Sequence, residues 1–182
     1  MKNRIVVGVV LLCSLFLTSC TKDKSQTIAG TYTYKTSGTV TLLPSQFVGL
    51  DDATLAMYRA AGVAVDPVVV GLYPEQGQMN VLKDGDSEGN VKITFNDLLG
   101  NADVTSGRVD GSSITLESGH VKAAQLTDGT DKIGAGIVAF SGSGKKYDDV
   151  LIIDFQYQGK FTVSGVDMTV VASDVHCVAK TN

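Results

Sequence analysis

The stretch Leu151-Ile152-Ile153-Asp154-Phe155-Gln156-Tyr157, followed by Gln158-Gly159, decides the fold class of this 182-residue chain. Leu151, Ile153, Phe155 and Tyr157 alternate with residues that include a carboxylate and an amide. Side chains two positions apart on a strand share a face, so the pattern predicts a strand with at least one covered face. The same alternation recurs over residues 91–95 and 113–117.

Working outward, we expect twelve strands, near residues 29–36, 39–43, 67–73, 78–83, 91–96, 103–109, 112–117, 120–126, 134–142, 149–157, 160–164 and 168–179. Candidate turns separate many of them: Asp84-Gly85, Asp110-Gly111, Asp128-Gly129 and Gln158-Gly159. Asp-Gly favours tight hairpins, and such short connections make neighbouring strands antiparallel. The chain is therefore predicted to be mainly β.

One segment, residues 51–62, is typical of a helix. Asp51 is a plausible N-cap, good helix formers follow it, and Gly62 stands where a helix stops. Leu55 and Tyr58 lie on one face. We expect this helix to pack against an opening or edge of the β structure, either as a plug of one end or as a lid over a cavity.

The first nineteen residues have the three parts of a secretory signal peptide. Lys2 and Arg4 precede an apolar run of about thirteen residues, Ile5 to Leu17, and small residues follow. The run is shorter than the roughly 20 residues that a membrane-spanning helix needs. Residues 1–19 are therefore expected to be removed, and the polar residues 20–27 to form a flexible tether before a single domain at 28–182.

Leu17-Thr18-Ser19-Cys20 resembles the bacterial lipobox, in which cleavage occurs just before the cysteine. The resemblance implies that Cys20 becomes the lipid-carrying first residue of the mature protein. It implies a membrane partner through this anchor, and a place in the bacterial cell envelope. Thr21 after the cysteine favours the outer membrane by the same analogy, with the periplasmic and cell-surface faces both open.

Removal of residues 1–19 would leave 163 residues with 13 Lys and Arg against 19 Asp and Glu. A net negative chain without a basic run gives no footprint for nucleic acid. Cys13 would leave with the signal and Cys20 would be lipidated, so Cys177 would be alone and no disulfide could form within the chain.

Ile28-Ala29-Gly30-Thr31-Tyr32 is similar to the Gly-x-aromatic start of the first strand in lipocalins and other calycin-like proteins. Classical lipocalins have Trp where this chain has Tyr32. A nearer resemblance is to calycin-like lipoproteins of Gram-negative bacteria, which share the lipobox, the Gly/Asp hairpins and a last strand like Val175-His176-Cys177-Val178. The resemblance implies an antiparallel up-and-down calycin-like (lipocalin-like) barrel with one short helix.

No motif indicates catalysis, a metal or another cofactor. Asp84–Gly89 begins like a calcium loop, but its twelfth position is Phe95 instead of the closing Glu. Gly134–Ala139 fits a dinucleotide fingerprint yet precedes a strand-like run. His176 and Cys177 are strand neighbours and should face opposite sides, although a metal site assembled across strands stays open.

Three functions from different classes follow. The first is a binding protein that holds a small, partly apolar molecule, with Tyr32, Tyr34, Phe95, Phe155 and Tyr157 lining the interior or simply filling it. The second is a non-enzymatic component of an envelope complex, for which Phe47 and Tyr147 are candidate exposed loop aromatics and whose protein partner is not identified. The third is a surface carbohydrate binder, against which the lack of Trp counts.

Overall fold

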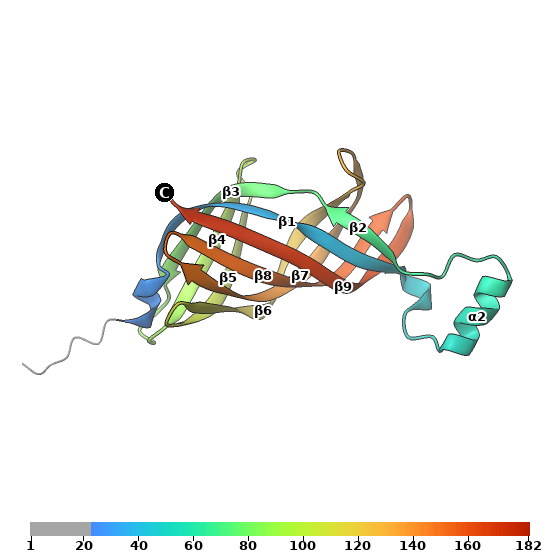
Figure 1. Ribbon diagram of the computed structural model, residues 1–182, viewed down its shortest axis with the longest axis horizontal. Helices are drawn as coiled ribbons and strands as arrows, with labels where there is room; N and C mark the ends of the chain where they lie inside the picture. The colour runs from blue at the N-terminus through green and yellow to red at the C-terminus, as the bar shows by residue number, and fades with distance from the viewer. Residues whose placement is uncertain (1–22) are drawn as a thin grey trace, which may run out of the picture.

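The computed structural model describes residues 23–182, and this part is almost entirely antiparallel β structure (Figure 1). The predicted signal peptide and the predicted lipid attachment at Cys20 concern residues outside the described part. The elements, in chain order, are η1 (Lys24–Thr27), β1 (Gly30–Pro44), η2 (Ser45–Phe47), α2 (Asp52–Ala60), β2 (Val68–Leu72), β3 (Glu75–Lys83), β4 (Asn90–Asp97), β5 (Ala102–Asp110), β6 (Ser113–Thr127), β7 (Lys132–Tyr147), β8 (Val150–Val163) and β9 (Val166–Thr181).

The strands form one sheet that closes on itself. Each strand from β3 to β9 pairs with the next along the chain, and β1 pairs with β3 on one side and with β9 on the other. The β1–β9 ladder runs from Tyr32↔Thr181 to Pro44↔Met168, nearly the full length of both strands. The result is a barrel-like ring without a free edge at the point where a sheet would otherwise end.

The wall of this ring is incomplete on one side. Strands β3, β4 and β5 have 9, 8 and 9 residues, whereas β1 has 15 and β6 has 15. Pairing of β5 with β6 stops at Gly107↔Leu116, and the same edge of β6 is paired again only where β2 meets it at Leu72↔Leu126. The short strands therefore leave a side opening between β5, β6 and the β2–β3 junction.

The prediction of a mainly β chain is confirmed, but three pairs of predicted strands are single strands. Residues 29–36 and 39–43 belong to β1, residues 112–117 and 120–126 to β6, and residues 149–157 and 160–164 to β8. Glycines interpreted as breaks, such as Gly38 and Gly159, lie inside strands with φ near +150°. The Gln158-Gly159 turn was a wrong prediction, whereas Asp84-Gly85, Asp110-Gly111 and Asp128-Gly129 do lie between strands.

These internal glycines let neighbouring strands approach closely. A Cβ on Gly38 would lie 2.1 Å from the carbonyl oxygen of Asp174 on β9, and a Cβ on Gly136 would lie 2.1 Å from that of Lys160 on β8. Glycine kinks of this kind allow a sheet to curve enough to close. The Gly134–Ala139 string, which imitates a nucleotide fingerprint, is accordingly part of strand β7.

The expected tether, residues 20–27, is ordered from Asp23 onward. The Asp23 carboxylate accepts hydrogen bonds from Ser25 N and Ser25 Oγ at 3.0 and 2.9 Å, and pairs with Lys83 at 2.7 Å. The hydrogen bond from Lys83 is the main reason why the pKa of Asp23 lies well below its usual range. Ser25 is fully buried, so η1 belongs to the folded domain and lies against one end of the ring.

The helix does not pack on the ring as expected. Figure 1 shows α2 standing beyond the end opposite η1, and no residue of α2 is buried. Its N-cap is Asp51, as predicted, with the carboxylate accepting a hydrogen bond from Thr54 N at 2.7 Å. Neither the plug nor the lid is observed. The ring of Tyr58 lies against Phe47 of η2, with 5.2 Å between the ring centroids, instead of against the strands.

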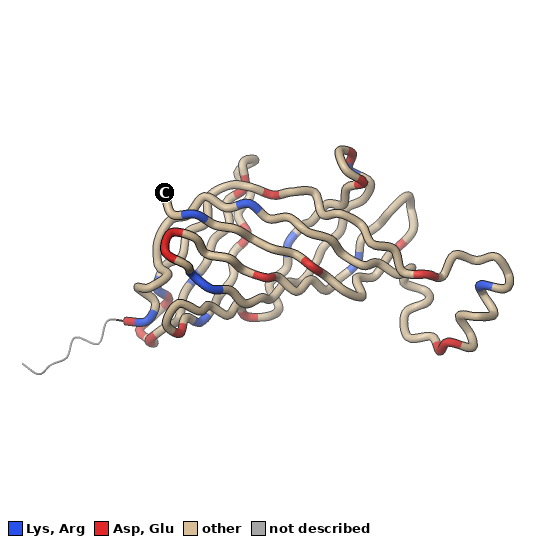
Figure 2. The backbone as a smooth tube through the Cα atoms, in the orientation of Figure 1, with Lys and Arg blue, Asp and Glu red and all other residues tan. Residues whose placement is uncertain are grey.

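The interior of the ring is filled by side chains at alternating strand positions. Those with no more than 1% exposure include Tyr32, Val40, Met79, Ile93, Ile114, Leu126, Leu151, Ile153, Phe161 and Cys177. Charged residues of both signs are distributed along the strands and in the loops (Figure 2). All of this packing lies within residues 23–182, so a chain that begins at Asp23 keeps every described contact.

The close approach of β1 and β9 generates a stability prediction. Gly38→Ala should lower the free energy of unfolding by more than about 3 kcal/mol, because it combines an unfavourable φ with an overlap against Asp174. The matched control is Gly62→Ala, which also has positive φ but no atom within 4 Å, and which should cost about 1 kcal/mol. Urea denaturation measures both, and equal losses would show that the strand contact is not limiting.

Candidate functional site

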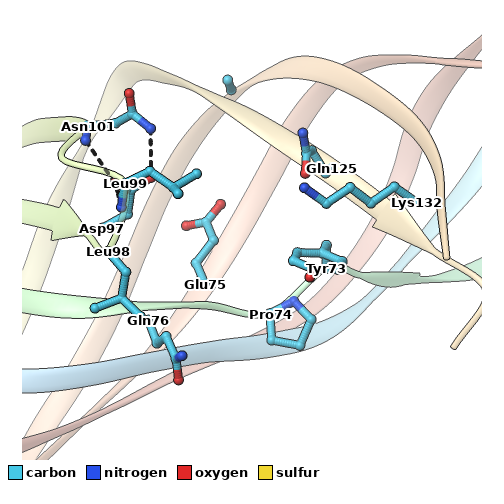
Figure 3. Close-up of a pocket in the computed structure, with 11 residues that line it drawn as sticks. Tyr73, Pro74, Glu75, Gln76, Asp97, Leu98, Leu99, Asn101, Gln125 and Lys132 are labelled. Atoms are coloured by element: carbon cyan, nitrogen blue, oxygen red, sulfur yellow. Dashed lines mark hydrogen bonds between the residues drawn. The ribbon is translucent and has the colours of Figure 1, made fainter. Parts of the chain in front are cut away.

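The side opening contains a pocket of about 410 Å³. It is lined by residues of the β2–β3 junction, the β4–β5 loop, β6 and the start of β7: Tyr73, Pro74, Glu75, Gln76, Asp97, Leu98, Leu99, Asn101, Ala123, Gln125 and Lys132. In Figure 3 the Glu75 side chain projects into the space between the β4–β5 loop and the strand that carries Gln125. We call this hollow the side pocket.

An ion cluster lies beside the side pocket and shares Glu75 with it. Lys122 on β6 donates a hydrogen bond to Glu75 on β3, and its Nζ lies 3.6 Å from a carboxylate oxygen of Asp103 on β5. The Lys122 side chain is only 8% exposed, against 27% for Glu75 and 32% for Asp103. The cluster thus connects three strands where backbone hydrogen bonds between β5 and β6 are missing.

The mouth of the side pocket is apolar and aromatic. Leu98 and Leu99, on the β4–β5 loop, are 72% and 86% exposed. Opposite them the Lys132 ammonium lies 4.5 Å from the centroid of the Tyr73 ring, within range of a cation–π interaction. Asp97 holds the loop in place, since its carboxylate accepts hydrogen bonds from Leu99 N and Asn101 N at 2.9 and 2.8 Å.

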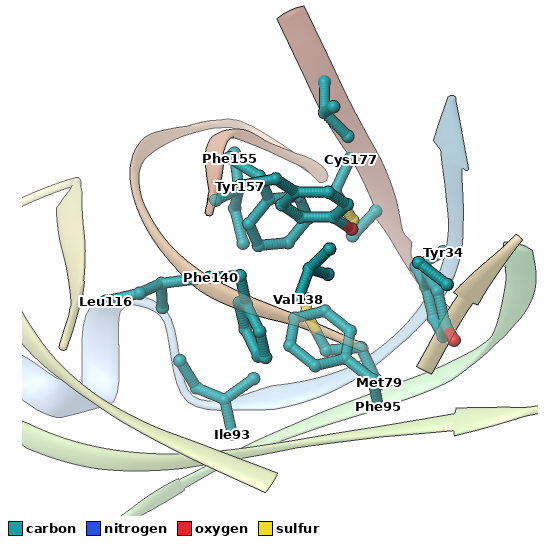
Figure 4. Close-up of a cluster of buried hydrophobic side chains, with 14 of the residues drawn as sticks. Tyr34, Met79, Ile93, Phe95, Leu116, Val138, Phe140, Phe155, Tyr157 and Cys177 are labelled. Atoms are coloured by element: carbon teal, nitrogen blue, oxygen red, sulfur yellow. The ribbon is translucent and has the colours of Figure 1, made fainter. Parts of the chain in front are cut away.

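Four of the five aromatic residues predicted as ligand contacts form one cluster in the interior (Figure 4). Ring centroids of Tyr34 and Phe95 are 5.3 Å apart, those of Phe95 and Phe155 6.0 Å, and those of Phe155 and Tyr157 6.0 Å. Phe140 joins the cluster at 5.7 Å from Phe155. Each ring is at least nine-tenths buried, so the cluster fills the interior, and its contact with a ligand stays a prediction.

Tyr32, the fifth candidate, has another environment. Its hydroxyl donates a hydrogen bond to the carbonyl oxygen of Ile28, and the Lys146 ammonium lies 5.6 Å from its ring centroid. It is fully buried and ties the start of β1 to the segment that follows η1. The structure therefore separates Tyr32 from the other four candidates and gives it a structural role.

Two tyrosine hydroxyls in the aromatic cluster have unused hydrogen-bonding capacity. Tyr34 and Tyr157 are 3% and 5% exposed, and neither hydroxyl makes a hydrogen bond to a residue in the described part of the chain. Each hydroxyl oxygen therefore keeps some contact with solvent, because no fully buried side-chain oxygen among the described residues lacks a partner. Burial raises the pKa of both, and the nearby charges of Glu75 and Asp103 raise it further. Both hydroxyls therefore stay neutral at physiological pH.

Two further hollows open on the outside of the ring. One, of about 780 Å³, includes Tyr34 and shares Gln76, Asp97 and Leu98 with the side pocket. The other, of about 490 Å³, includes Tyr157 and lies where the pairing of β8 with β9 is interrupted between Phe155 and Lys160. The side pocket combines exposed apolar side chains with a carboxylate, Glu75, that is paired with the buried Lys122, which makes it the strongest candidate site.

His176 and Cys177 face opposite sides, as predicted. His176 lies on the outside between Asp154 and Asp174, with nitrogen–oxygen distances of 2.6 and 3.0 Å, and the hydrogen bond to Asp154 raises its pKa. Cys177 is fully buried and, within residues 23–182, is a free cysteine. Phe47, predicted as an exposed loop aromatic, is buried, whereas Tyr147 is exposed.

Sequence reasoning missed Glu75, Asp103 and Lys122. Each stands in the inward-facing phase of its strand: Glu75 with Met79, Asp103 with Val109, and Lys122 with Leu126. A charged residue in the apolar phase is a signal that could have identified them. Lys122 keeps the inward phase of Ile114 and Leu116, although the pairing of β6 with β7 is interrupted between Leu116 and His120.

No protein-family model, curated protein or solved structure matches this chain. Among residues 23–182, no helix is both long and apolar enough to cross a membrane. The same residues contain no cluster of three or more His, Cys, Asp or Glu side chains arranged to hold a metal ion. The evidence for the candidate site is therefore its own geometry.

The buried thiol generates a reactivity prediction. Burial raises the pKa of Cys177 to about 12, so the reactive thiolate is scarce at neutral pH and is also shielded from solvent. In a chain of residues 23–182, Cys177 should resist a disulfide reagent such as Ellman's reagent in the native state and react fully in urea. Rapid native labelling, at the rate of the unfolded control, would contradict the buried position.

Proposed function

We propose that this protein is a lipid-anchored component of a bacterial cell envelope that binds a small, partly apolar molecule at the side pocket and performs no catalysis. The observation that carries the proposal is the combination of a concave side pocket, an apolar mouth and a lining carboxylate, Glu75, that is paired with the buried Lys122. Ligand sites are typically mostly apolar hollows with a few polar groups that fix orientation.

The arrangement of the strands supports a calycin-like, lipocalin-like identity for the ring. Strands β1 and β3 to β9 make a continuous circuit in which sequence neighbours pair, as in up-and-down barrels. The Gly30-Thr31-Tyr32 signature stands at the start of β1 and Val175-His176-Cys177-Val178 lies in β9, which closes on it. We propose this identity on both grounds.

Membrane attachment is proposed from the lipobox-like Leu17-Thr18-Ser19-Cys20. Asp23, bound to Ser25 and Lys83, is only three residues beyond Cys20, and a chain of three residues spans about 10 Å at most. An anchor on Cys20 would therefore hold the η1 end of the ring close to the bilayer. The proposed location is the outer membrane, with either the periplasmic or the cell-surface face open.

A second candidate function is an interaction protein of an envelope complex, and the segment around α2 favours it. This segment, residues 48–69, extends from the end of the ring opposite η1 (Figure 1) and exposes several apolar side chains. Met57 is 74% exposed and Val69 is 68% exposed. Clusters of exposed apolar side chains are typical of protein contact sites.

Native mass spectrometry tests the binding proposal. Residues 23–182, purified from a bacterial host, should carry an additional mass that disappears on denaturation. In the matched variant Leu98→Asp/Leu99→Asp, the apolar mouth of the side pocket is lost and the additional mass should be lost too. A bare chain under all gentle ionisation conditions would overturn the proposal.

Membrane fractionation tests the anchor. Full-length protein should sediment with membranes, whereas Cys20→Ala should be released in soluble form with an unchanged far-ultraviolet circular dichroism spectrum, because the ring lies outside the anchor. Cys177→Ala is the matched control and should still sediment with membranes. Equally firm membrane association of Cys20→Ala and the parent would refute lipid anchoring at this cysteine.

A further inference from the structure

The hollow of about 780 Å³ on the outside of the ring crosses four neighbouring strands, β9, β1, β3 and β4. We call it the outer hollow, and its lining includes Lys35, Gln76, Gln78, Leu98, Val178 and Lys180. Glu75 does not line it, and in Figure 3 the side chain of Gln76 points away from that of Glu75. The outer hollow is therefore separate from the ion cluster, although it adjoins the side pocket.

The strand register places two cationic side chains next to one another in the outer hollow. Lys35 lies opposite Val178 in the β1–β9 ladder, and Lys180 lies opposite Thr33 in the same ladder. Lys35 and Lys180 are therefore diagonal neighbours on one face of the sheet, about 7–8 Å apart. Both side chains are exposed and both line the outer hollow, so their ammonium groups can reach the same bound group.

Neither of these lysines has an acidic partner within the described part of the chain. Lys24, Lys83 and Lys122 each form an ion pair with a carboxylate, whereas Lys35 and Lys180 form none among residues 23–182. An ammonium group favours a charge-assisted hydrogen bond to a carboxylate or a phosphate. The two lysines thus offer donors and positive charge that the protein itself does not use.

The one carboxylate among the described residues that line the outer hollow is already engaged. Asp97 accepts hydrogen bonds from Leu99 N, Asn101 N and Asn101 Nδ2 at 2.9, 2.8 and 2.7 Å. The hydrogen bond from the Asn101 side chain is the main reason why the pKa of Asp97 lies below its usual value. Two lysines and one aspartate give the lining a formal charge of one positive, in a chain whose net charge is −4.

Apolar side chains border the outer hollow at its β9 side and at its β4–β5 side. Val178 on β9 is 41% exposed, and Leu98 on the β4–β5 loop is 72% exposed. Ile152, 38% exposed, lies opposite Val178 in the β8–β9 ladder and extends the apolar surface beyond the hollow. A molecule with an apolar chain would remove part of this surface from water.

We propose that the outer hollow binds an amphipathic anion, with its acidic group at Lys35 and Lys180 and its apolar chain along Val178 and Leu98. This is a second ligand site, and it goes beyond the function proposed for the side pocket. The side-chain amides of Gln76 and Gln78 line the same hollow and can donate further hydrogen bonds to a carboxylate or a phosphate. A volume of about 780 Å³ lies within the range typical of small-molecule sites.

Four probes separate an amphipathic anion from general apolar binding and from general anion binding. Octanoate, octanol, octylamine and inorganic phosphate are titrated into residues 23–182 by isothermal calorimetry, each amphiphile below its micellar concentration. Octanoate should bind at least about fivefold more tightly than any of the other three, the scale of an exposed charge pair. Amide shifts in nuclear magnetic resonance spectra should locate octanoate at Gly77, Leu98 and Val178.

Variants then test the two lysines. Lys35→Gln and Lys180→Gln should each weaken octanoate binding about fivefold and leave octanol binding unchanged. Lys92→Gln is the matched control for general attraction to a lysine, because Lys92 is an exposed lysine of β4 that does not line the outer hollow. It should leave octanoate binding unchanged. Thermal unfolding checks that each variant is folded.

The proposal is wrong if octanoate does not bind, or if octanol, octylamine or phosphate binds as tightly as octanoate does. It is also wrong if Lys92→Gln weakens octanoate binding as much as Lys35→Gln does. The probe series needs no variant, so it decides the ligand class even if a substitution prevents folding.

The function proposed for the side pocket is tested separately, because neither Lys35 nor Lys180 lines that pocket. A co-purified mass that belongs to the side pocket should persist in the double variant Lys35→Gln/Lys180→Gln, whatever the octanoate titrations show. Loss of that mass in the folded double variant would assign the co-purified molecule to the outer hollow, in support of the second site and against the first.

Discussion

The pairing of β1 with β9 is the constraint on which the rest of the structure depends. It joins the two ends of the chain along thirteen residue pairs and converts a meander into a ring. Once the ring is closed, every strand has a neighbour on both sides. A short strand therefore leaves part of a longer strand unpaired within the wall, because there is no free edge at which the short strand could lie. The shortfall of β3, β4 and β5 against β1 and β6 therefore appears inside the wall, as the side opening.

The candidate site is thus a joint consequence of ring closure and of the mismatch in strand length. Where β5 and β6 diverge, their backbone groups lose strand partners, and a fold that left such groups unpaired in an apolar interior would be strongly destabilised. Lys122, Glu75 and Asp103 bring side-chain polarity to the same place, and Ser106 N donates a hydrogen bond to His120 at 3.3 Å. Polar groups are needed there for folding, and the same groups are available to a ligand.

Much of the fold could be predicted from the sequence, because alternation such as that of Leu151, Ile153, Phe155 and Tyr157 reports burial directly. The strand boundaries could not, since a glycine that lets strands approach, such as Gly38 or Gly159, has the same local signature as a glycine in a turn. The side opening could not be predicted from the sequence either. It depends on which strands are short relative to partners far away in the sequence, and no local pattern reports that relation.

The aromatic residues were recognisable as a set, but their arrangement relative to the charges was not. Tyr34 and Tyr157 belong to one aromatic cluster, although they are far apart in the sequence, because β1 and β8 both flank β9 in the closed ring. Burying a lysine is costly unless it is paired, so Lys122 constrains where Glu75 and Asp103 can lie, and through them the shape of the pocket base. The position of these charged groups is therefore fixed by folding.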